Sequence, residues 1–219
     1  MLDTTRPWLP YALKFVNVED LPHTQQLQDF DVQATALSHR VPSFAYSFSE
    51  KTVENRLDAT RLEGEGITPG PEWGQLRQGN DVQGADGRVL RALDYLLPTR
   101  KPRKIIIGGD NDTPDLLLEE ASSADVLVHE ATYTEDVLHK VGPGPQHSSA
   151  KRVARLASAA RIKNLVLTHF SPRYQEQQGS PSLTDIEAEA RAVYDGRLYL
   201  ANDLDRYLLD RQGVLTRAA

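Results

Sequence analysis

The 219-residue sequence contains no cysteine. Disulfide bonds and thiolate zinc sites are therefore excluded. Any metal ion that this chain binds must be held by histidine, aspartate or glutamate side chains.

Long hydrophobic runs are also missing. No apolar stretch approaches the length of a membrane span, and the first ten residues, MLDTTRPWLP, contain no apolar signal core. We therefore expect neither export nor membrane insertion, and we expect a cytoplasmic protein. A formal net charge of −6 argues against nucleic-acid binding through bulk positive charge, while a local basic patch would still bind phosphates.

The remaining composition is that of a globular protein with mixed α/β structure. Hydrophobic residues make up 39% of the chain and charged residues 26%, which suffices for one large domain or a small pair. Apolar and β-branched runs predict strands, and amphipathic segments between the later strands predict helices. The expected strands are 12–18, 32–37, 44–48, 104–108, 125–129, 164–169, 197–201 and 205–209.

Three helices are expected between these later strands. Thr113 and Pro114 form a cap and first-turn proline before DLLLEEA, and residues 148–160 place five alanine and valine side chains on one face. Thr184 and Glu187 match a capping box before EAEARAVY. The order strand, helix, strand from Lys104 onward predicts a layered sheet covered by helices.

The segment Leu57–Gly87 has a different character. It contains GITPGPEWG, is rich in glycine and shows little periodicity, so we expect an extended arm or loop. We expect Ile67 and Trp73 to pack against each other at its end.

Polar residues follow three of the apolar strands. KIIIGGD ends in Asp110, DVLVHE ends in His129 and Glu130, and NLVLTH ends in His169. Ligand sites in open α/β sheets lie beyond the carboxyl ends of the strands, so these groups are expected to face one crevice. A calcium loop at Asp110 is excluded, because positions six and twelve are Asp115 and Ala121 instead of glycine and glutamate.

Several motifs together resemble the ribonuclease Z family, tRNA 3′-processing endoribonucleases of the metallo-β-lactamase fold. HRVPSFAYSFSE, from His39, is similar to the family's third metal motif, and GITPGPEWGQLRQGNDV to its Gly-Pro-containing substrate arm. GGDNDTPD resembles its aspartate motif, HEAT and HSSA resemble two further motifs, and THFSPRY is nearly identical to its closing motif. These motifs span the chain from about Tyr11 to Leu209.

The resemblance implies a fold, a cofactor and partners. The fold would be an α/β, metallo-β-lactamase-type αββα sandwich, N-terminally truncated, with residues 1–219 forming a single incomplete domain and 57–87 an inserted arm. The complete site would hold two Zn²⁺ ions, the substrate would be precursor tRNA, and the protein would form a homodimer. The arm would be an exosite for the RNA.

The resemblance also implies residue roles. Asp110 would bridge the two metals, and His39 and His169 would each ligate one. His147 would be a general acid near the leaving oxygen, oriented by Glu130, a pairing that fixes the tautomer and favours the imidazolium. Arg173 would hold a substrate phosphate, although its alternative role is simply to close the turn with Tyr174. His23 and His139 have no motif context and are expected at the surface.

The sequence departs from the family in one important respect. It contains no HxHxDH motif, which in the family supplies ligands to both metals, so by this resemblance we expect roughly the first third of that domain to be absent. The densest basic run, RKPRK at Arg100–Lys104, would either touch RNA or approach its strand through solvent.

Three functions follow from these observations. The first is a ribonuclease Z whose activity belongs to a complete form, and the second is a small-molecule phosphodiesterase of the same superfamily. The third is a non-catalytic RNA-binding remnant. The arm argues against the second, and the retention of His39, Asp110, His147 and His169 argues against the third.

Overall fold

A computed structural model describes residues 17–18, 24–51, 53–84, 86–174 and 181–218. The strand expected at 12–18 and the surface position expected for His23 lie outside the described residues, apart from Asn17 and Val18. Across the described part of the chain, no helix has the length and apolar character needed to cross a membrane.

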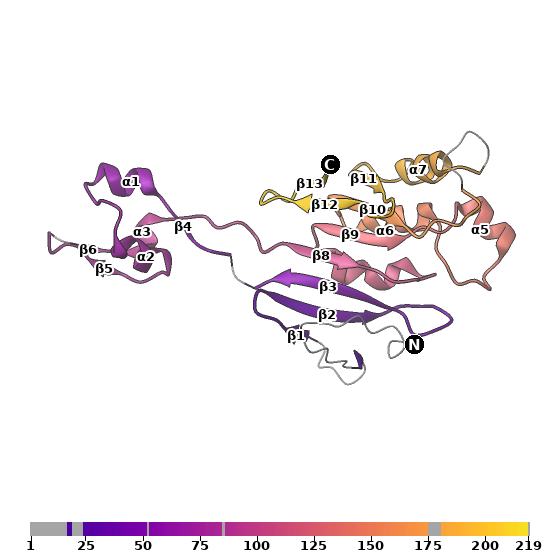
Figure 1. The fold of residues 1–219 in the computed structure, drawn as a ribbon, viewed down its shortest axis with the longest axis horizontal. Coiled ribbons are helices and arrows are strands. Elements are labelled where there is room, and N and C mark those ends of the chain that lie inside the picture. Colours follow the sequence, from indigo (N-terminus) through magenta and orange to yellow (C-terminus); the bar gives the residue numbers. More distant parts are fainter. Residues whose placement is uncertain (1–16, 19–23, 52, 85, 175–180, 219) are drawn as a thin grey trace, which may run out of the picture.

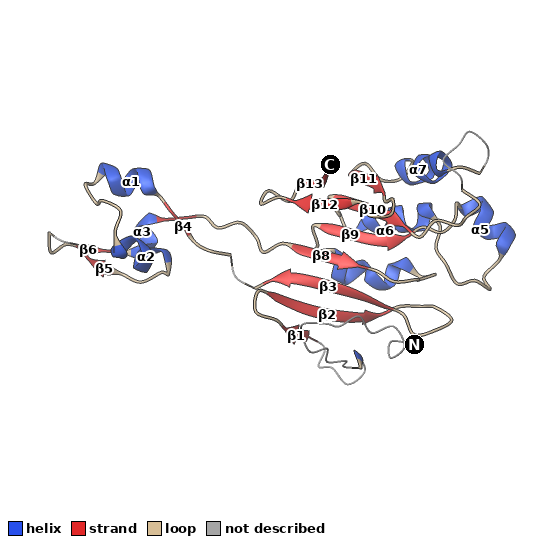
Figure 2. Ribbon diagram, viewed as in Figure 1, coloured by secondary structure: helices blue, strands red, loops and turns tan. Residues whose placement is uncertain are grey.

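A seven-stranded sheet forms the body of the protein, in the order β1-β2-β3-β8-β9-β10-β11 (Figures 1 and 2). The first three strands and β8 are antiparallel neighbours, and β8 to β11 are parallel. The carboxyl ends of β2 and of β8 to β11 consequently lie at the same edge. The bounds are β1 (Thr24–Gln26), β2 (Phe30–Ala36), β3 (Phe44–Glu50), β8 (Lys104–Ile107), β9 (Val126–Glu130), β10 (Asn164–Thr168) and β11 (Arg197–Leu200).

Alternate residues of the central strands pack on opposite faces of this sheet. Leu165 and Leu167 of β10 join the main core beneath the helices. Val166 joins a smaller cluster beneath the hairpin of β12 (Arg206–Leu209) and β13 (Leu215–Ala218). Burial on both faces explains why these strands are continuous apolar runs. The expected strands between residues 32 and 209 are thus confirmed, with ends shifted by one or two residues.

Helices cover one face of the sheet. They are α4 (Leu118–Ala121), which follows the 3₁₀ turn Pro114–Leu117, α5 (Glu135–Val141), α6 (Ala150–Ala159) and α7 (Leu183–Arg191). The amphipathic helix expected at 148–160 is confirmed as α6, which begins at the cap Ser149 and buries Ala150, Val153, Ala154 and Ala157. The helix expected after Thr113 begins with Pro114, but its first turn is 3₁₀.

The capping box expected for α7 was placed two residues too late. Ser182 is the cap and Asp185 its reciprocal partner, whereas Thr184 and Glu187 are already inside the helix. Asp185 takes the place of the usual glutamate or glutamine, so the earlier pair does not match the usual pattern as closely as Thr184 and Glu187 do.

Residues 56–97 form a separate unit that projects from the body, here called the arm unit (Figure 1). Its elements are β4 (Arg56–Leu57), α1 (Ala59–Gly64), α2 (Pro71–Arg77), β5 (Val82–Gln83), β6 (Val89–Leu90), α3 (Ala92–Tyr95) and β7 (Leu96–Leu97). Leu62, Leu76 and Leu90 are buried in a core of its own, against which Ile67 and Trp73 pack. The sequence predicted an extended arm or loop, and the difference arises because helices of four to seven residues leave almost no periodic pattern.

Three side chains of the basic run Arg100–Lys104 form ion pairs within the fold. The Arg100 and Arg103 guanidiniums both donate to the Glu50 carboxylate and hold its pKa far below the usual range. Lys104 Nζ lies 2.7 Å from Glu120 Oε1. These three side chains are therefore not purely solvated, and contact of the run with RNA stays a prediction.

Candidate metal and catalytic site

The backbone between β8 and Asp110 runs close to the start of β3. The Gly109 backbone N–H donates to Phe44 O at 3.1 Å, and a Cβ on Gly109 would lie 2.7 Å from Ser43 Oγ. Only glycine allows the chain to pass β3 so closely. The pair Gly108-Gly109 therefore fixes where the Asp110 carboxylate emerges.

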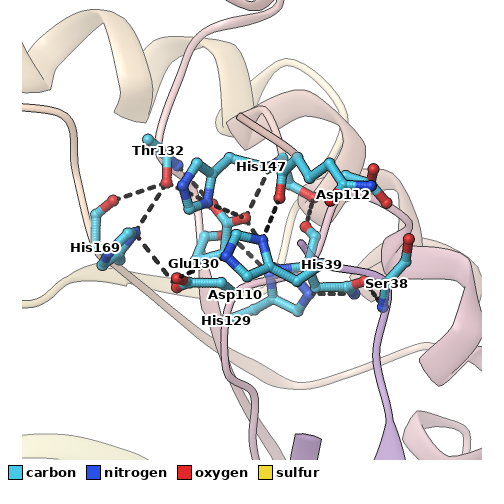
Figure 3. A network of polar contacts seen from close by, with 12 residues as sticks. Ser38, His39, Asp110, Asp112, His129, Glu130, Thr132, His147 and His169 are labelled. Carbon is cyan, nitrogen blue, oxygen red and sulfur yellow. Dashed lines mark hydrogen bonds and ion pairs between the residues drawn. The ribbon is translucent and has the colours of Figure 1, made fainter. Parts of the chain in front are cut away.

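The Asp110 carboxylate lies between two histidines (Figure 3). Its Oδ2 is 3.6 Å from His39 Nε2, and its Oδ1 is 3.6 Å from His169 Nδ1. His39 follows β2 and His169 follows β10, so the parallel strand ends bring together residues 130 positions apart. The His39 Nδ1–H donates to Gln146 O at 2.9 Å, which leaves Nε2 as the atom that faces Asp110.

His147 lies between these histidines. Its ring centroid is 5.1 Å from that of His39 and 5.2 Å from that of His169. His147 Nδ1 is 3.2 Å from Glu130 Oε1. With Nδ1–H donating to the carboxylate, Nε2 is free to act on a ligand.

Glu130 is a buried carboxylate with an almost complete set of donors. Its side chain is 2% exposed, and Oε1 also accepts from the backbone N–H groups of Asn111 and Ser148. Oε2 accepts from Thr132 N at 3.0 Å and from Thr132 Oγ1 at 2.6 Å. Burying a charge is tolerated here because each oxygen has at least two donors. Glu130 therefore ties three segments of the site to β9.

Two site residues have left-handed backbone conformations. His169 has φ of 57° and Gln146, the residue before His147, has φ of 55°. Such conformations are costly for residues with a Cβ and are typical of functional sites. Their effect here is to turn the His169 ring and the Gln146 carbonyl toward Asp110 and His39. Sequence patterns contain no signal for this strain.

His129 does not face the crevice, contrary to the expectation from its strand-end position. It is fully buried, its Nδ1 donates to the Glu130 carbonyl at 2.7 Å, and its Nε2 accepts from the Asn111 amide at 3.1 Å. Burial lowers its pKa, so the ring is held neutral. The alternation of side chains along β9 explains the outcome, because Glu130 occupies the position on the crevice side.

Arg173 lies at the margin of the site. Its guanidinium carbon is 5.9 Å from the centre of the Tyr133 ring, and this ring packs edge-on against His147 at 6.2 Å. The Tyr174 backbone N–H closes the turn by donating to Ser171 O at 2.9 Å, and Arg173 Nη1 donates to Ser171 Oγ at 3.4 Å within the same turn. The phosphate-binding role of Arg173 stays a prediction. His139 is at the surface as expected, 3.4 Å from Glu135.

A cavity of about 510 Å³ opens beside these groups. It is lined by Asp110, Glu130 and His169, and also by Phe170, Ala201 and Asp203. Neither Phe170 nor Asp203 was among the residues predicted for the site. Asp203 could have been found, because it follows β11 and obeys the same strand-end rule as Asp110.

The donor set suits a divalent cation. Two groups of three side chains could each hold an ion, because the ligand atoms within each group lie within 4.8 Å of one another. One group is His39, Asp110 and His147, and the other is Glu130, His147 and His169. Imidazole and carboxylate donors without thiolate suit borderline divalent ions. His147 belongs to both groups, so the geometry brings the predicted residues together but leaves ligand and acid roles as predictions.

Comparison with known proteins gives a consistent result. The chain is 51% identical to the ribonuclease Z of Marinobacter nauticus over 204 residues, 93% of this chain and 63% of that relative. It is 48% identical to the ribonuclease Z of Pseudomonas putida (strain GB-1) over 209 residues, 95% of this chain and 65% of the relative. The chain thus spans less than two thirds of the length of these relatives. No protein-family model matches it.

A solved structure supports the fold. The metallo-β-lactamase fold protein YhfI of Bacillus subtilis superimposes with a TM-score of 0.50 and 14% sequence identity, over 89% of this chain and 52% of YhfI. At this identity the likeness concerns the fold alone. The large mixed sheet with helices on one face is therefore of the metallo-β-lactamase type.

Proposed function

We propose that this chain, which belongs to the ribonuclease Z family, supplies metal-binding and acid–base residues to an endoribonuclease that cleaves the 3′ trailer from precursor tRNA. Its relatives are named for ribonuclease Z, but the chain spans less than two thirds of their length. The activity is therefore inferred from the site. The observation that supports it best is the placement of the Asp110 carboxylate between His39 and His169, with His147 held by Glu130.

Phosphodiester hydrolysis requires charge neutralisation at the phosphate and a proton for the leaving oxygen. Divalent cations held by Asp110 together with His39 and with His169 would draw charge from the phosphate oxygens. We propose Zn²⁺, two ions per complete site, because the donors are nitrogen and oxygen atoms of the kind zinc accepts. HxHxDH ligands are not present in this sequence, so these three residues would provide only part of the ligation.

Side chains of this chain would supply the proton that the leaving oxygen needs. Glu130 holds Nδ1 of His147, so Nε2 would present a proton to the leaving oxygen in the crevice. The nearby Arg173 guanidinium, which has five donors in a planar fork, would hold a non-bridging phosphate oxygen.

The remaining parts of the proposal rest on the family. The arm unit would be the RNA exosite, a role supported by its own buried core and by its projection away from the crevice. A homodimeric assembly is carried over from the resemblance, and a cytoplasmic location from the sequence composition.

A fusion tests this function directly. The part of the Marinobacter relative that this chain does not match would be joined to this chain, and cleavage of a precursor tRNA would be measured. His147→Ala should slow cleavage by about two to four orders of magnitude with the metal content intact. Asp110→Ala should lose metal and activity together. Normal cleavage by the His147→Ala fusion would remove the general-acid assignment, and an inactive, metal-loaded fusion would overturn the proposal.

A further inference from the structure

A second cavity lies where the arm unit joins the body. Its volume is about 630 Å³, and it is lined by residues 53–57, Arg77, residues 98–100, Arg211 and Gln212. These residues precede β8 or form the turn between β12 and β13, whereas Asp110 follows the other end of β8. Figure 1 shows the β12–β13 turn on the side of the body from which the two connecting loops lead to the arm unit. We call this space the neck cavity; it is at the opposite edge of the sheet from the catalytic crevice.

The neck cavity has an excess of positive charge. Four arginines line it, against the single carboxylate of Glu54. Arg100 is committed to Glu50, with Nη2 and Oε1 3.0 Å apart. Arg56, Arg77 and Arg211 are exposed and form no ion pair with any residue that the structure describes.

Several arginines elsewhere in the fold pair with carboxylates, while others, such as Arg155 and Arg161 on the helical side, are single exposed charges. In the arm unit Arg61 lies 3.1 Å from Glu65, and in the body Arg152 lies 2.9 Å from Glu135 and Arg217 3.1 Å from Asp205. The chain has a formal charge of −6, so carboxylates are plentiful. The neck cavity differs from these single sites because Arg56, Arg77 and Arg211 gather around one space with only Glu54 to oppose them, an arrangement that favours binding of an anion.

The three arginines come from different parts of the chain, and a hydrogen bond holds the end of the helix that carries Arg77. Arg56 is in β4, Arg77 ends α2, and Arg211 is in the hairpin turn of the body. The Asn55 side-chain amide donates to Arg77 O at 2.9 Å, which holds the end of α2 against the strand beside it. The arm unit and the body thus both present a guanidinium to the same space.

The walls are unsuited to a small apolar ligand. The only apolar side chains in the lining are Val53, Leu57 and Pro98, whereas small-molecule sites are lined mainly by hydrophobic groups. Separated guanidiniums on a polar surface are typical of contacts to the phosphates of a nucleic-acid backbone.

We propose that the neck cavity binds backbone phosphates of an RNA, through Arg56, Arg77 and Arg211, at a position away from the scissile bond. The proposal rests on the proposed function for the identity of the polyanion. These contacts would position the RNA and add affinity, and they would leave the chemistry at Asp110 and His147 unchanged. Because they are phosphate contacts, they would also be independent of sequence.

The test measures binding of a fluorescently labelled precursor tRNA to the full chain over a range of salt concentrations. A triple variant, Arg56→Gln with Arg77→Gln and Arg211→Gln, should bind about tenfold or more weakly at moderate salt. The slope of log K against log salt should fall by about two to three, for three lost contacts. The matched control removes three exposed charges from the helical side, with Lys140→Gln, Arg155→Gln and Arg161→Gln, and should keep both values near those of the wild type.

Each other outcome overturns a defined part of the proposal. Equal affinity and slope for wild type and triple variant, with unchanged thermal melting, would remove the neck site while leaving the cleavage function untouched. Displacement of the RNA by millimolar inorganic phosphate, beyond a chloride control of equal ionic strength, would assign the cavity to a free anion instead. No RNA binding by the wild-type chain would overturn the neck site, and cleavage by the fusion would show separately whether the catalytic proposal survives.

Discussion

Replacing Glu130 by glutamine removes the charge from the carboxylate that joins β9 to the loops around the site. In the folded chain, Oε1 is contacted by Asn111 N at 3.2 Å, Ser148 N at 2.8 Å and His147 Nδ1 at 3.2 Å. Oε2 is contacted by Thr132 N at 3.0 Å and Thr132 Oγ1 at 2.6 Å. Glutamine keeps the shape but replaces one acceptor by an NH₂ donor.

The cost of Glu130→Gln follows from this donor count. If the NH₂ group takes the place of Oε2, the Thr132 hydroxyl can rotate to accept, but the Thr132 N–H loses its acceptor. If it takes the place of Oε1, two backbone N–H groups lose theirs. One buried unsatisfied group costs about 1–3 kcal/mol, and the remaining bonds to a neutral acceptor are roughly half as strong as before. We expect unfolding free energy to fall by about 3 kcal/mol, or Tm by roughly 6–12 °C.

Urea unfolding of the wild type and two variants measures this effect. The control is Glu187→Gln on α7, where the carboxylate is half exposed and 3.7 Å from Arg191, and it should cost about 0.5 kcal/mol or less. If the two substitutions lowered the unfolding free energy equally, with equal slopes in urea, Glu130 would not be the residue that holds the loops of the site in place.

Three further outcomes are expected. The extensively dialysed chain should retain well under two zinc ions by elemental analysis, since His39, Asp110 and His169 give each ion about two protein ligands; two tightly held ions would contradict this. In a second variant, Asn-Gly replaces residues 58–95 and joins Leu57 to Leu96, which are paired in the structure. This deletion should weaken precursor-tRNA binding by the fusion and leave hydrolysis of a small chromogenic phosphodiester unchanged. Full retention of both activities would favour a small-molecule phosphodiesterase. Glu50→Gln should destabilise the chain above about pH 5, and the difference from wild type should shrink as pH falls below about 4. The sign follows from the lowered folded-state pKa of Glu50, whose stabilising contribution is lost on acidification; a pH-independent difference in urea titrations would count against it.

The body of the fold was accessible from sequence because its strands are buried on both faces. Continuous apolar runs such as residues 164–168 can be recognised without an alignment, and α6 is recognisable because its small side chains recur at helical spacing. The arm unit was not accessible. Its core is assembled from residues as distant as Leu62 and Tyr95, on helices too short to show a period.

The candidate site was partly accessible for a topological reason. Parallel strands end at one edge, so polar residues after β8 and β10 had to meet, and the structure places Asp110 within 3.6 Å of His169. The same rule misassigned His129, because it identifies the strand end without saying which face the side chain takes. The left-handed conformations of Gln146 and His169 lay beyond any sequence rule, since both residue types are common with ordinary backbone angles.

The two proposed sites lie at opposite ends of β8, with RNA binding at one end and catalysis at the other. Arg100, in the lining of the neck cavity, and Asp110, in the crevice, are ten residues apart, so a chain at roughly 3.3 Å per residue would separate them by up to about 33 Å. A mononucleotide is far too small to touch both places at once, whereas a folded RNA can. Contacts at the neck cavity would therefore favour a polymer over its fragments without altering the reacting atoms. This arrangement requires that the three neck substitutions change the KM of a fusion for precursor tRNA and leave its rate on a small phosphodiester alone. A change in both would place the neck arginines in the support of the catalytic site, in spite of their position at the opposite edge of the sheet.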